Sequence, residues 1–313
     1  MLSTSGPAFR PHPERGTPPL RRPGPRAVAW GVLLVARPRQ WIKNLLVAAA
    51  PALAGALDSA AAAADTLLAF LLFCAAASGT YLLNDIADAE ADRAHARKRH
   101  RPIASGLVPV PLAAVLGALL IGSAPLVALA AAKPRLALVL VGYLALSVSY
   151  TYGLKHLPLC DIAAVAGCHV LRALAGGATT GVPITGWFLA VVSLGALLVV
   201  AGKREAELRT PASRRTRATL AYYTTGFLTR LRIATASAMV ATYFLWAWTT
   251  PTGLAQVLTV ASIVPLVMAV FRLHALVDRG IGEEPEELVL RDRPLQLCLA
   301  ALGALVLLGV HVG

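Results

Sequence analysis

The sequence predicts an all-helical membrane protein, and three observations support this fold class. Of the 313 residues, 57% are hydrophobic and only 14% are charged, which is far from the composition of an ordinary soluble domain. Apolar stretches of about 18 to 22 residues, each long enough to cross the hydrocarbon core of a bilayer, recur along the chain. The positively charged residues gather in alternate connections between these stretches.

Nine stretches are expected to be transmembrane helices arranged as one bundle. They cover residues 39–57, 64–86, 111–131, 135–153, 159–178, 185–202, 230–250, 255–273 and 294–312. Residues 27–36 are too short to span and are expected to lie in the membrane interface, so the transmembrane domain is taken as residues 27–313. Residues 1–26 hold seven of the 21 prolines and five arginines, which predicts a disordered cytoplasmic arm.

The distribution of Lys and Arg predicts the orientation of the chain. With the amino terminus in the cytoplasm, the connections near 87–110, 154–158, 203–229 and 274–293 lie inside. Of the 29 Lys and Arg residues, only Lys133 and Arg135 then lie outside, as the positive-inside rule requires. We therefore expect a multi-pass protein of the cell membrane with a polar cavity that faces the cytoplasm. The net charge of +13 reflects this topology and a demand for anionic ligands, and nucleic acid is not expected as a partner.

An acidic stripe closes the second predicted helix, at its cytoplasmic end. Asn84, Asp88 and Asp92 recur every four residues, and Asp85 lies in the same stripe as Tyr81, so a helix would place them on one polar face. Carboxylates at the edge of a bilayer are costly unless they bind something. Hard oxygen ligands suit Mg²⁺, which prefers a few carboxylates together with the phosphate oxygens of a substrate. The alternative is a solvated helix end, but the basic segment 93–101 that follows favours a metal with a diphosphate.

Cations from several predicted helices are expected to converge with this acidic stripe on one cavity. The candidates are Lys43, Lys98, Arg101, Lys155, Arg172, Lys203 and Arg204. Lys43 could alternatively extend to the lipid headgroups. Arg172 could alternatively have a structural role by donating hydrogen bonds to carbonyls at a helix end. Asp161 and Arg172 share a face of the fifth predicted helix but lie about 16 Å apart along its axis, so each needs another partner.

Other functional motifs are missing from the sequence. It has no GxxxxGK[ST], GxSxG or HExxH motif, and its four cysteines show no CxxC spacing, so they are expected to be packing residues. The glutamates of 283–287 are expected to form a solvated loop, with a lid or a subunit contact as the alternative. Arg291 and Asp292 are better candidates for a role because they adjoin the last predicted helix.

The acidic stripe resembles the first aspartate-rich motif of the UbiA superfamily of intramembrane prenyltransferases. The matching pattern is Asn-Asp-x-x-Asp-x-x-x-Asp at 84–92, with Tyr81 before it and Lys98, Arg101 and Pro102 after it. The resemblance covers nearly the whole chain after residue 36. It implies the UbiA-type bundle, with Mg²⁺ at this motif as the cofactor that ionises a diphosphate substrate.

Five further segments are similar to the actinobacterial decaprenyl-phosphate phosphoribosyltransferase branch of this family. They are RPRQWIKN at 37–44, HARKRHRPIASG at 95–106, YGLKH at 152–156, GKREAEL at 202–208 and LRDR at 290–293. The similarity implies transfer of a 5-phosphoribosyl group from phosphoribosyl diphosphate (PRPP) to a polyprenyl phosphate, for the arabinan of the cell wall. It also implies a homo-oligomer, with the trimer of that branch as the expected form.

The resemblance assigns a role to each candidate residue. Asn84 and Asp88 would bind Mg²⁺ directly, and the catalytic carboxylates would be Asp85, Asp88 and Asp92. The phosphates and the ribose would be bound by Lys43, Tyr81, Lys98, Arg101, Lys155, Arg172, Lys203 and Arg204.

The sequence of the connection after the sixth predicted helix distinguishes between two possible donor substrates. Members that use prenyl diphosphates carry a second aspartate-rich motif there, whereas residues 203–209 read KREAELR and suit an additional phosphate. Glu205 stands where the branch is expected to have Tyr. The alternatives are a UbiA-type prenyltransferase acting on an aromatic or quinone-precursor acceptor, and a non-enzymatic carrier or lipid-binding scaffold. No duplicate of 84–106 supports a repeat-built transporter.

Overall fold

The computed structural model describes residues 24–94, 98–210, 218–250 and 252–312, and these residues form helices without any β-strand. The longer helices are α1 (Pro25–Ala36), α3 (Ala60–Ala87), α5 (Val110–Ala130), α6 (Pro134–Tyr152), α7 (Cys160–Thr180), α8 (Gly186–Arg209), α10 (Thr225–Thr249), α12 (Ile263–Asp278) and α14 (Arg293–Val312). The shorter elements are η1 (Pro38–Ala48), α2 (Ala49–Leu53), η2 (Ala56–Asp58), α4 (Ala89–Arg93), η3 (Lys98–His100), η4 (Leu154–His156), η5 (Ala218–Tyr222), α11 (Leu254–Ala261) and α13 (Pro285–Arg291).

Seven helical segments of the described chain are long and apolar enough to cross a membrane. They are α3, α5, α6, α7, α8, the joined pair α11–α12 and α14, and each coincides with a predicted span. The predicted span 230–250 falls on α10, which is 25 residues long but carries Arg230 and Arg232 and is not among the seven. The coarse prediction of an all-helical bundle of several apolar helices is confirmed.

The first predicted span, 39–57, is wrong as a single continuous helix. Residues 38–48 form a 3₁₀ helix, which is long for this conformation, and a five-residue α-helix follows before the chain turns at Gly55 with φ 64°. Pro51 lies inside the predicted span and lacks the backbone donor that a regular helix needs there, and hydropathy does not register this. The predicted disordered arm, 1–26, lies almost entirely outside the described residues, and the predicted interfacial segment 27–36 lies within α1.

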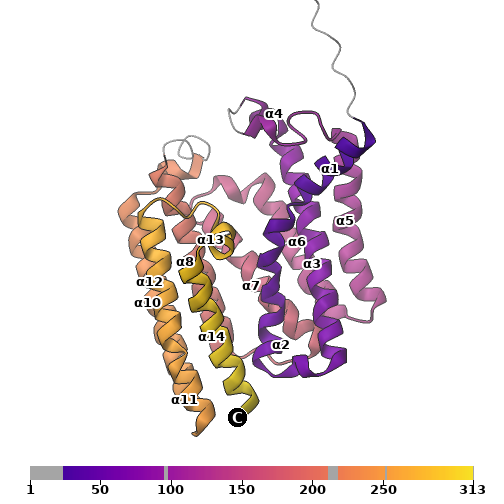
Figure 1. Ribbon diagram of the computed structural model, residues 1–313. Coiled ribbons are helices and arrows are strands. Elements are labelled where there is room, and N and C mark those ends of the chain that lie inside the picture. The colour runs from indigo at the N-terminus through magenta and orange to yellow at the C-terminus, as the bar shows by residue number, and fades with distance from the viewer. Residues whose placement is uncertain (1–23, 95–97, 211–217, 251, 313) are drawn as a thin grey trace, which may run out of the picture.

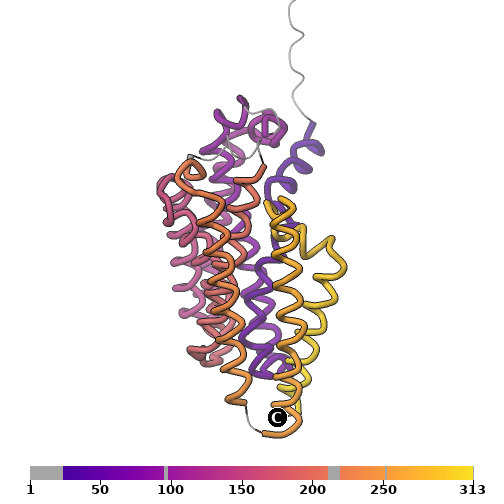
Figure 2. Tube along the Cα trace, turned by 90° about the vertical axis from the view of Figure 1, so that its left-hand side faces the viewer, coloured from indigo at the N-terminus to yellow at the C-terminus, as the bar shows by residue number. Residues whose placement is uncertain are grey.

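The helices run along a common direction in two groups, which are visible side by side in Figure 1. One group contains α3, α5, α6 and α7, and the other contains α8, α10, α12 and α14; α7 packs against α8 to join them. Figure 2, turned by 90°, shows the same near-parallel course of the long helices. Phe73 and Tyr143 lie in the core of the first group, and Met239 and Leu266 lie in the core of the second.

The 3₁₀ segment η1 packs closely on α7 because α7 has a glycine at the contact. A Cβ atom on Gly176 would overlap the carbonyl oxygen of Val47 and lie 2.8 Å from Pro51 Cδ. This approach brings Lys43 and Asn44 of η1 against the middle of the bundle. The ends of α3, α6, α8 and α12 and the beginnings of α5, α7, α10 and α14 share the upper end in Figure 1, opposite the carboxyl terminus. The polar connections therefore meet at one end of the bundle.

Candidate active site

The acidic stripe at the end of α3 divides into a buried pair and a partly exposed pair. Asp85 is 2% exposed and Asp92 is 3% exposed, and both accept from arginines. Arg37 Nη2 lies 2.7 Å from Asp85 Oδ1, and Arg101 Nη1 lies 2.7 Å from Asp92 Oδ2 and 3.4 Å from Asp85 Oδ1. These contacts join α3 and α4 to the segments on either side, which fixes the shape of this end of the bundle.

The partly exposed pair consists of Asn84 and Asp88, one helical turn apart. Asn84 Nδ2 donates to Asp88 Oδ2 at 3.1 Å, and Lys155 Nζ of η4 donates to Asp88 Oδ1 at 2.7 Å. The Asp88 side chain is 31% exposed, so a ligand from solvent can reach it. An amide oxygen and a carboxylate in this position are suitable Mg²⁺ ligands. No three His, Cys, Asp or Glu side chains of the described residues group as a metal site, so substrate oxygens would have to complete the coordination.

Arg172 lies at the centre of the bundle, and its partners among the described residues are neutral. Its Nε donates to Asn44 Oδ1 at 2.7 Å, its Nη2 to Tyr143 Oη at 2.9 Å and its Nη1 to the Cys168 carbonyl at 2.8 Å. The guanidinium carbon also lies 4.7 Å from the centre of the Tyr143 ring. As expected, it does not pair with Asp161. Among the described carboxylates none forms an ion pair with it, so Arg172 keeps a buried positive charge that favours an anion.

Lys43 and Tyr81 lie beside Arg172 and Arg37. Arg37 stacks over the Tyr81 ring at 5.1 Å from its centre, and Lys43 interacts electrostatically with both Arg172 and Arg37. Lys203 of α8, whose Nζ lies 3.9 Å from Glu207 Oε1, belongs to the same region, since its charge also interacts with that of Lys43. Four of the predicted substrate-binding residues are therefore close together where the two groups of helices meet.

Glu286 of α13 joins these cations, and its position corrects a prediction. It was expected in a solvated loop, but it is 4% exposed and its Oε2 lies 3.0 Å from Lys43 Nζ. Burial raises the pKa of the Glu286 carboxyl, but the ammonium groups of Lys43 and Lys203 outweigh burial and hold that pKa below its usual value. Its role could not be predicted from the sequence, because three neighbouring glutamates make the segment look like a solvated acidic loop.

Arg204 lies in a separate cluster at the adjoining ends of α7 and α8. Its side chain is 1% exposed, and its Nε and Nη1 donate to Asp161 Oδ2 and Glu207 Oε2, each at 2.8 Å. Tyr223 Oη donates to Asp161 Oδ1 at 2.6 Å, and burial together with this hydrogen bond raises the pKa of Tyr223 to about 12. Arg204 and Asp161 are thus each other's partners. Lys98, another predicted binding residue, begins η3 and is half-buried.

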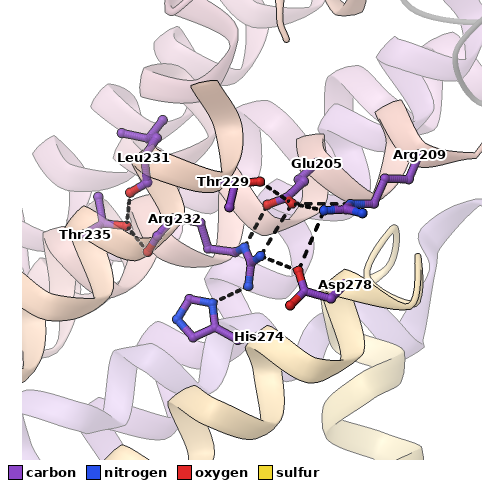
Figure 3. A network of polar contacts seen from close by, with 8 residues as sticks. All are labelled: Glu205, Arg209, Thr229, Leu231, Arg232, Thr235, His274 and Asp278. Atoms are coloured by element: carbon purple, nitrogen blue, oxygen red, sulfur yellow. Dashed lines mark hydrogen bonds and ion pairs between the residues drawn. The ribbon is translucent and has the colours of Figure 1, made fainter. Parts of the chain in front are cut away.

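Glu205 forms a third cluster that ties together α8, α10 and α12, shown in Figure 3. Its Oε2 accepts from Arg232 Nε and its Oε1 from Arg209 Nη2, each at 2.7 Å, and Thr229 donates to Oε1 at 2.7 Å. Arg232 also donates to Asp278 Oδ1 at 2.6 Å and contacts the His274 ring. Glu205 is fully buried, and donors from Arg232, Arg209 and Thr229 surround its carboxylate.

An apolar cavity of about 460 Å³ lies towards the opposite end of the bundle. It is lined by α2, the 182–185 segment, α8, α10 and α14, with large side chains from Leu53, Ile184, Trp187, Phe188, Trp246 and Leu307. A cavity of this composition suits a hydrocarbon chain.

Two contacts in the acidic region and the core were not predicted. Arg37 precedes η1 and neutralises Asp85, and Tyr143 in α6 accepts from Arg172. A tyrosine inside an apolar helix usually needs a hydrogen-bond partner, and this signal could have pointed to Tyr143. No comparable local signal identifies Arg37, because its partner lies 48 residues away.

The chain is similar to known proteins in both sequence and fold. The sequence matches the UbiA prenyltransferase family over residues 45–291. A decaprenyl-phosphate phosphoribosyltransferase of Mycobacterium tuberculosis H37Rv is 41% identical over 297 residues, which cover 91% of this chain and 97% of that protein. The protein of the same name from Corynebacterium glutamicum is 39% identical over 305 residues, which cover 93% of this chain and 90% of that protein.

Two solved structures show a similar fold. A UbiA homologue from Archaeoglobus fulgidus, bound to DMAPP and Mg²⁺, superposes with a TM-score of 0.69 at 16% identity and covers 90% of this chain and 100% of that chain. A UbiA homologue from Aeropyrum pernix superposes with a TM-score of 0.56 at 17% identity and covers 91% and 98%.

Proposed function

This chain belongs to the UbiA prenyltransferase family, and on that premise we propose that it transfers a 5-phosphoribosyl group from PRPP to decaprenyl phosphate and releases diphosphate. The observation that carries the proposal is 39–41% identity to relatives named decaprenyl-phosphate phosphoribosyltransferases, over 91–93% of the chain. The saturation of Glu205 by Arg232 and Arg209 supports this choice, because it leaves that carboxylate no room to act as a second metal ligand.

Asn84 and Asp88 are the residues that would hold a Mg²⁺ ion. When bound there, the ion would neutralise the charge that grows on the departing diphosphate. Asp85 and Asp92 would support this position indirectly, since they fix Arg37 and Arg101 and thereby the end of α3. We assign these two carboxylates to positioning rather than to direct contact with the substrate.

The phosphates and the ribose of PRPP would be bound by five cations and one tyrosine. Lys43, Tyr81, Arg172 and Lys203 come from the junction of the two helix groups, Lys155 from its position beside Asp88, and Lys98 from η3. Arg172 supports this assignment best, because it is buried, positively charged and bonded only to neutral groups among the described residues. We assign Arg101 and Arg204 to holding the surrounding helix ends, since both already donate to buried carboxylates.

The acceptor needs little activation by the protein. The phosphate of a polyprenyl phosphate is already anionic near neutral pH, so no strong general base is required at the site. Catalysis would then depend on positioning the lipid phosphate against the anomeric carbon and on neutralising the leaving group. Attack from the face opposite the diphosphate would invert the anomeric centre and give a β-linked product, for use in cell-wall arabinan synthesis.

The polyprenyl chain would lie in the apolar cavity beside α2, α8 and α14. We place α10 and the η1–α2 segment across the bilayer as the two remaining crossings, which gives nine in all. In support, α10 is long enough to span and lies alongside α8. The protein would lie in the cell membrane as a homo-oligomer, with the acidic end of the bundle towards the cytoplasm, where most of the Lys and Arg residues are expected.

A transfer assay with two labelled donors tests the proposal. Membranes containing the chain receive decaprenyl phosphate with either ribose-labelled PRPP or a labelled prenyl diphosphate and an aromatic acceptor. We expect the ribose label to enter the lipid fraction, and a chelator to stop the transfer. Transfer from the prenyl diphosphate but not from PRPP would instead establish a UbiA-type prenyltransferase and contradict the proposal.

A further inference from the structure

The short helix α13 connects α12 to α14 and packs against η1. The chain leaves α12 through Gly280, whose φ of 76° favours glycine. Gly282 then packs closely: a Cβ atom there would lie 3.1 Å from both Ala206 Cβ and Val277 Cγ2. This route brings α13 to the junction of the two helix groups, between α12 and Lys43.

The two glutamates in the first turn of α13 have opposite surroundings. Glu287 is one-third exposed and lies near Arg39 and Arg291 at the surface. Glu286 is buried, and although its Oε2 lies 3.0 Å from Lys43 Nζ, that oxygen has no hydrogen bond of satisfactory geometry. A buried carboxylate oxygen without a hydrogen bond is unfavourable unless nearby positive charge compensates for it. Lys43 and Lys203 supply that charge.

We propose that Glu286 is an internal substitute for a substrate phosphate: it occupies the positively charged site between Lys43 and Lys203 in the resting protein, and an incoming phosphate group displaces it together with α13. The inference rests on the proposed function, because that function assigns Lys43 and Lys203 to phosphate binding.

The exchange has a simple electrostatic basis. A phosphate group carries up to two negative charges and three acceptor oxygens, so it can satisfy both lysines where the carboxylate is poorly bonded. Without a phosphate, Glu286 prevents mutual repulsion of Lys43 and Lys203 in a buried position. After the reaction Glu286 returns to the lysines and favours release of the product. The cost is that the site is closed in most resting molecules, which weakens apparent phosphate binding.

Calorimetric titration of the full chain in detergent with Mg²⁺ tests this exchange. The probes are inorganic pyrophosphate and ribose 5-phosphate, and the variants are Glu286→Gln and the matched control Glu287→Gln. We expect Glu286→Gln to bind one of the probes about tenfold more tightly than the wild type, and Glu287→Gln to match the wild type. The probe that gains affinity identifies the phosphate that displaces Glu286. Equal or weaker binding of both probes by Glu286→Gln would make it a structural ion-pair partner only.

Hydrogen exchange on the wild-type protein gives a test that needs no variant to fold. The backbone amides of 286–291 should exchange faster when a saturating probe displaces α13. Slower or unchanged exchange would overturn the inference. Both measurements depend on binding alone, so a wild-type protein that binds the probes as expected but transfers no label from PRPP would refute the proposed function and leave the displacement of Glu286 in place.

Discussion

Lys155 Nζ lies 2.7 Å from Asp88 Oδ1, so an ion pair ties the connection after α6 to the last turn of α3. Asp85, only one turn earlier, is enclosed by two arginines and almost inaccessible, whereas Asp88 has about a third of its side chain exposed. Asp88 is therefore accessible to a ligand, whereas Asp85 stabilises the end of α3 through its arginine partners. The predictions below separate these two roles.

Replacement of Asp88 by Ala should abolish transfer of phosphoribosyl groups and leave the fold intact. The carboxylate is partly exposed and its loss removes a proposed metal ligand, so we expect a rate about a thousandfold below that of the wild type. Glu90, which is exposed in the same motif, provides the matched control Glu90→Ala. Labelled product formation measures both rates, and near wild-type turnover in Asp88→Ala would refute the metal assignment.

Replacement of Lys155 by Met should weaken PRPP binding more than it slows turnover. Its ammonium group neutralises Asp88 in the resting protein and would face the diphosphate in the complex. We expect the KM for PRPP to rise about tenfold, which corresponds to loss of one partly exposed charged contact. Arg99→Met, at an exposed position in the basic segment, should leave KM unchanged. A selective fall in kcat would contradict this role.

The Glu205 cluster should contribute to stability rather than to PRPP binding. Arg232→Met leaves Glu205 with one fewer buried partner, and we expect the apparent melting temperature in detergent to fall by about 10 °C. Arg230→Met, at an exposed position in the same helix, should have little effect.

The double variant Glu205→Leu with Arg232→Met should recover part of this loss, because it removes the uncompensated buried charge. Strictly additive effects in the thermal denaturation of the four proteins would show that the two side chains are not coupled.

Stability should decrease in acid through Asp292. The hydrogen bonds from Arg272 hold the pKa of the Asp292 carboxyl below its usual value, and the Leu295 amide, which donates to Asp292 Oδ1 at 2.9 Å, acts in the same direction. A carboxyl with a lowered folded-state pKa stabilises the fold above its unfolded pKa of about 3.9 and loses this contribution as the pH falls through the folded value. The melting-temperature advantage of the wild type over Asp292→Asn should therefore be constant from about pH 6 to 8 and shrink below about pH 4. A constant advantage down to pH 3 would contradict the prediction.

Local patterns in the sequence were enough to predict most of the helices and the acidic stripe. Asn84, Asp88 and Asp92 repeat with helical spacing, and each apolar stretch has the length of a membrane span, so both features depend on neighbouring residues only. The break within 39–57 could not be predicted from hydropathy, because hydropathy does not register the missing donor of Pro51.

Charge pairing over long distances could not be read from the sequence in the same way. The sequence placed Arg204 and Arg172 together as candidates for binding phosphate. In the structure Arg204 donates to Asp161 and Glu207, whereas the partners of Arg172 among the described residues are neutral. Glu286 was assigned to a solvated loop because its neighbours are acidic, and only the packing of α13 on η1 separates it from Glu287.

The burial of Arg232 also bears on how the chain reaches its final form. An arginine in the hydrocarbon region of an isolated helix costs about 3 kcal/mol during insertion, and α10 carries this residue about two turns after its start. Glu205, its counter-ion, belongs to the preceding long helix of the described chain. Glu205 is therefore synthesised before Arg232, and in the proposed nine-span arrangement α8 and α10 would enter the lipid as a pair whose charges already neutralise each other.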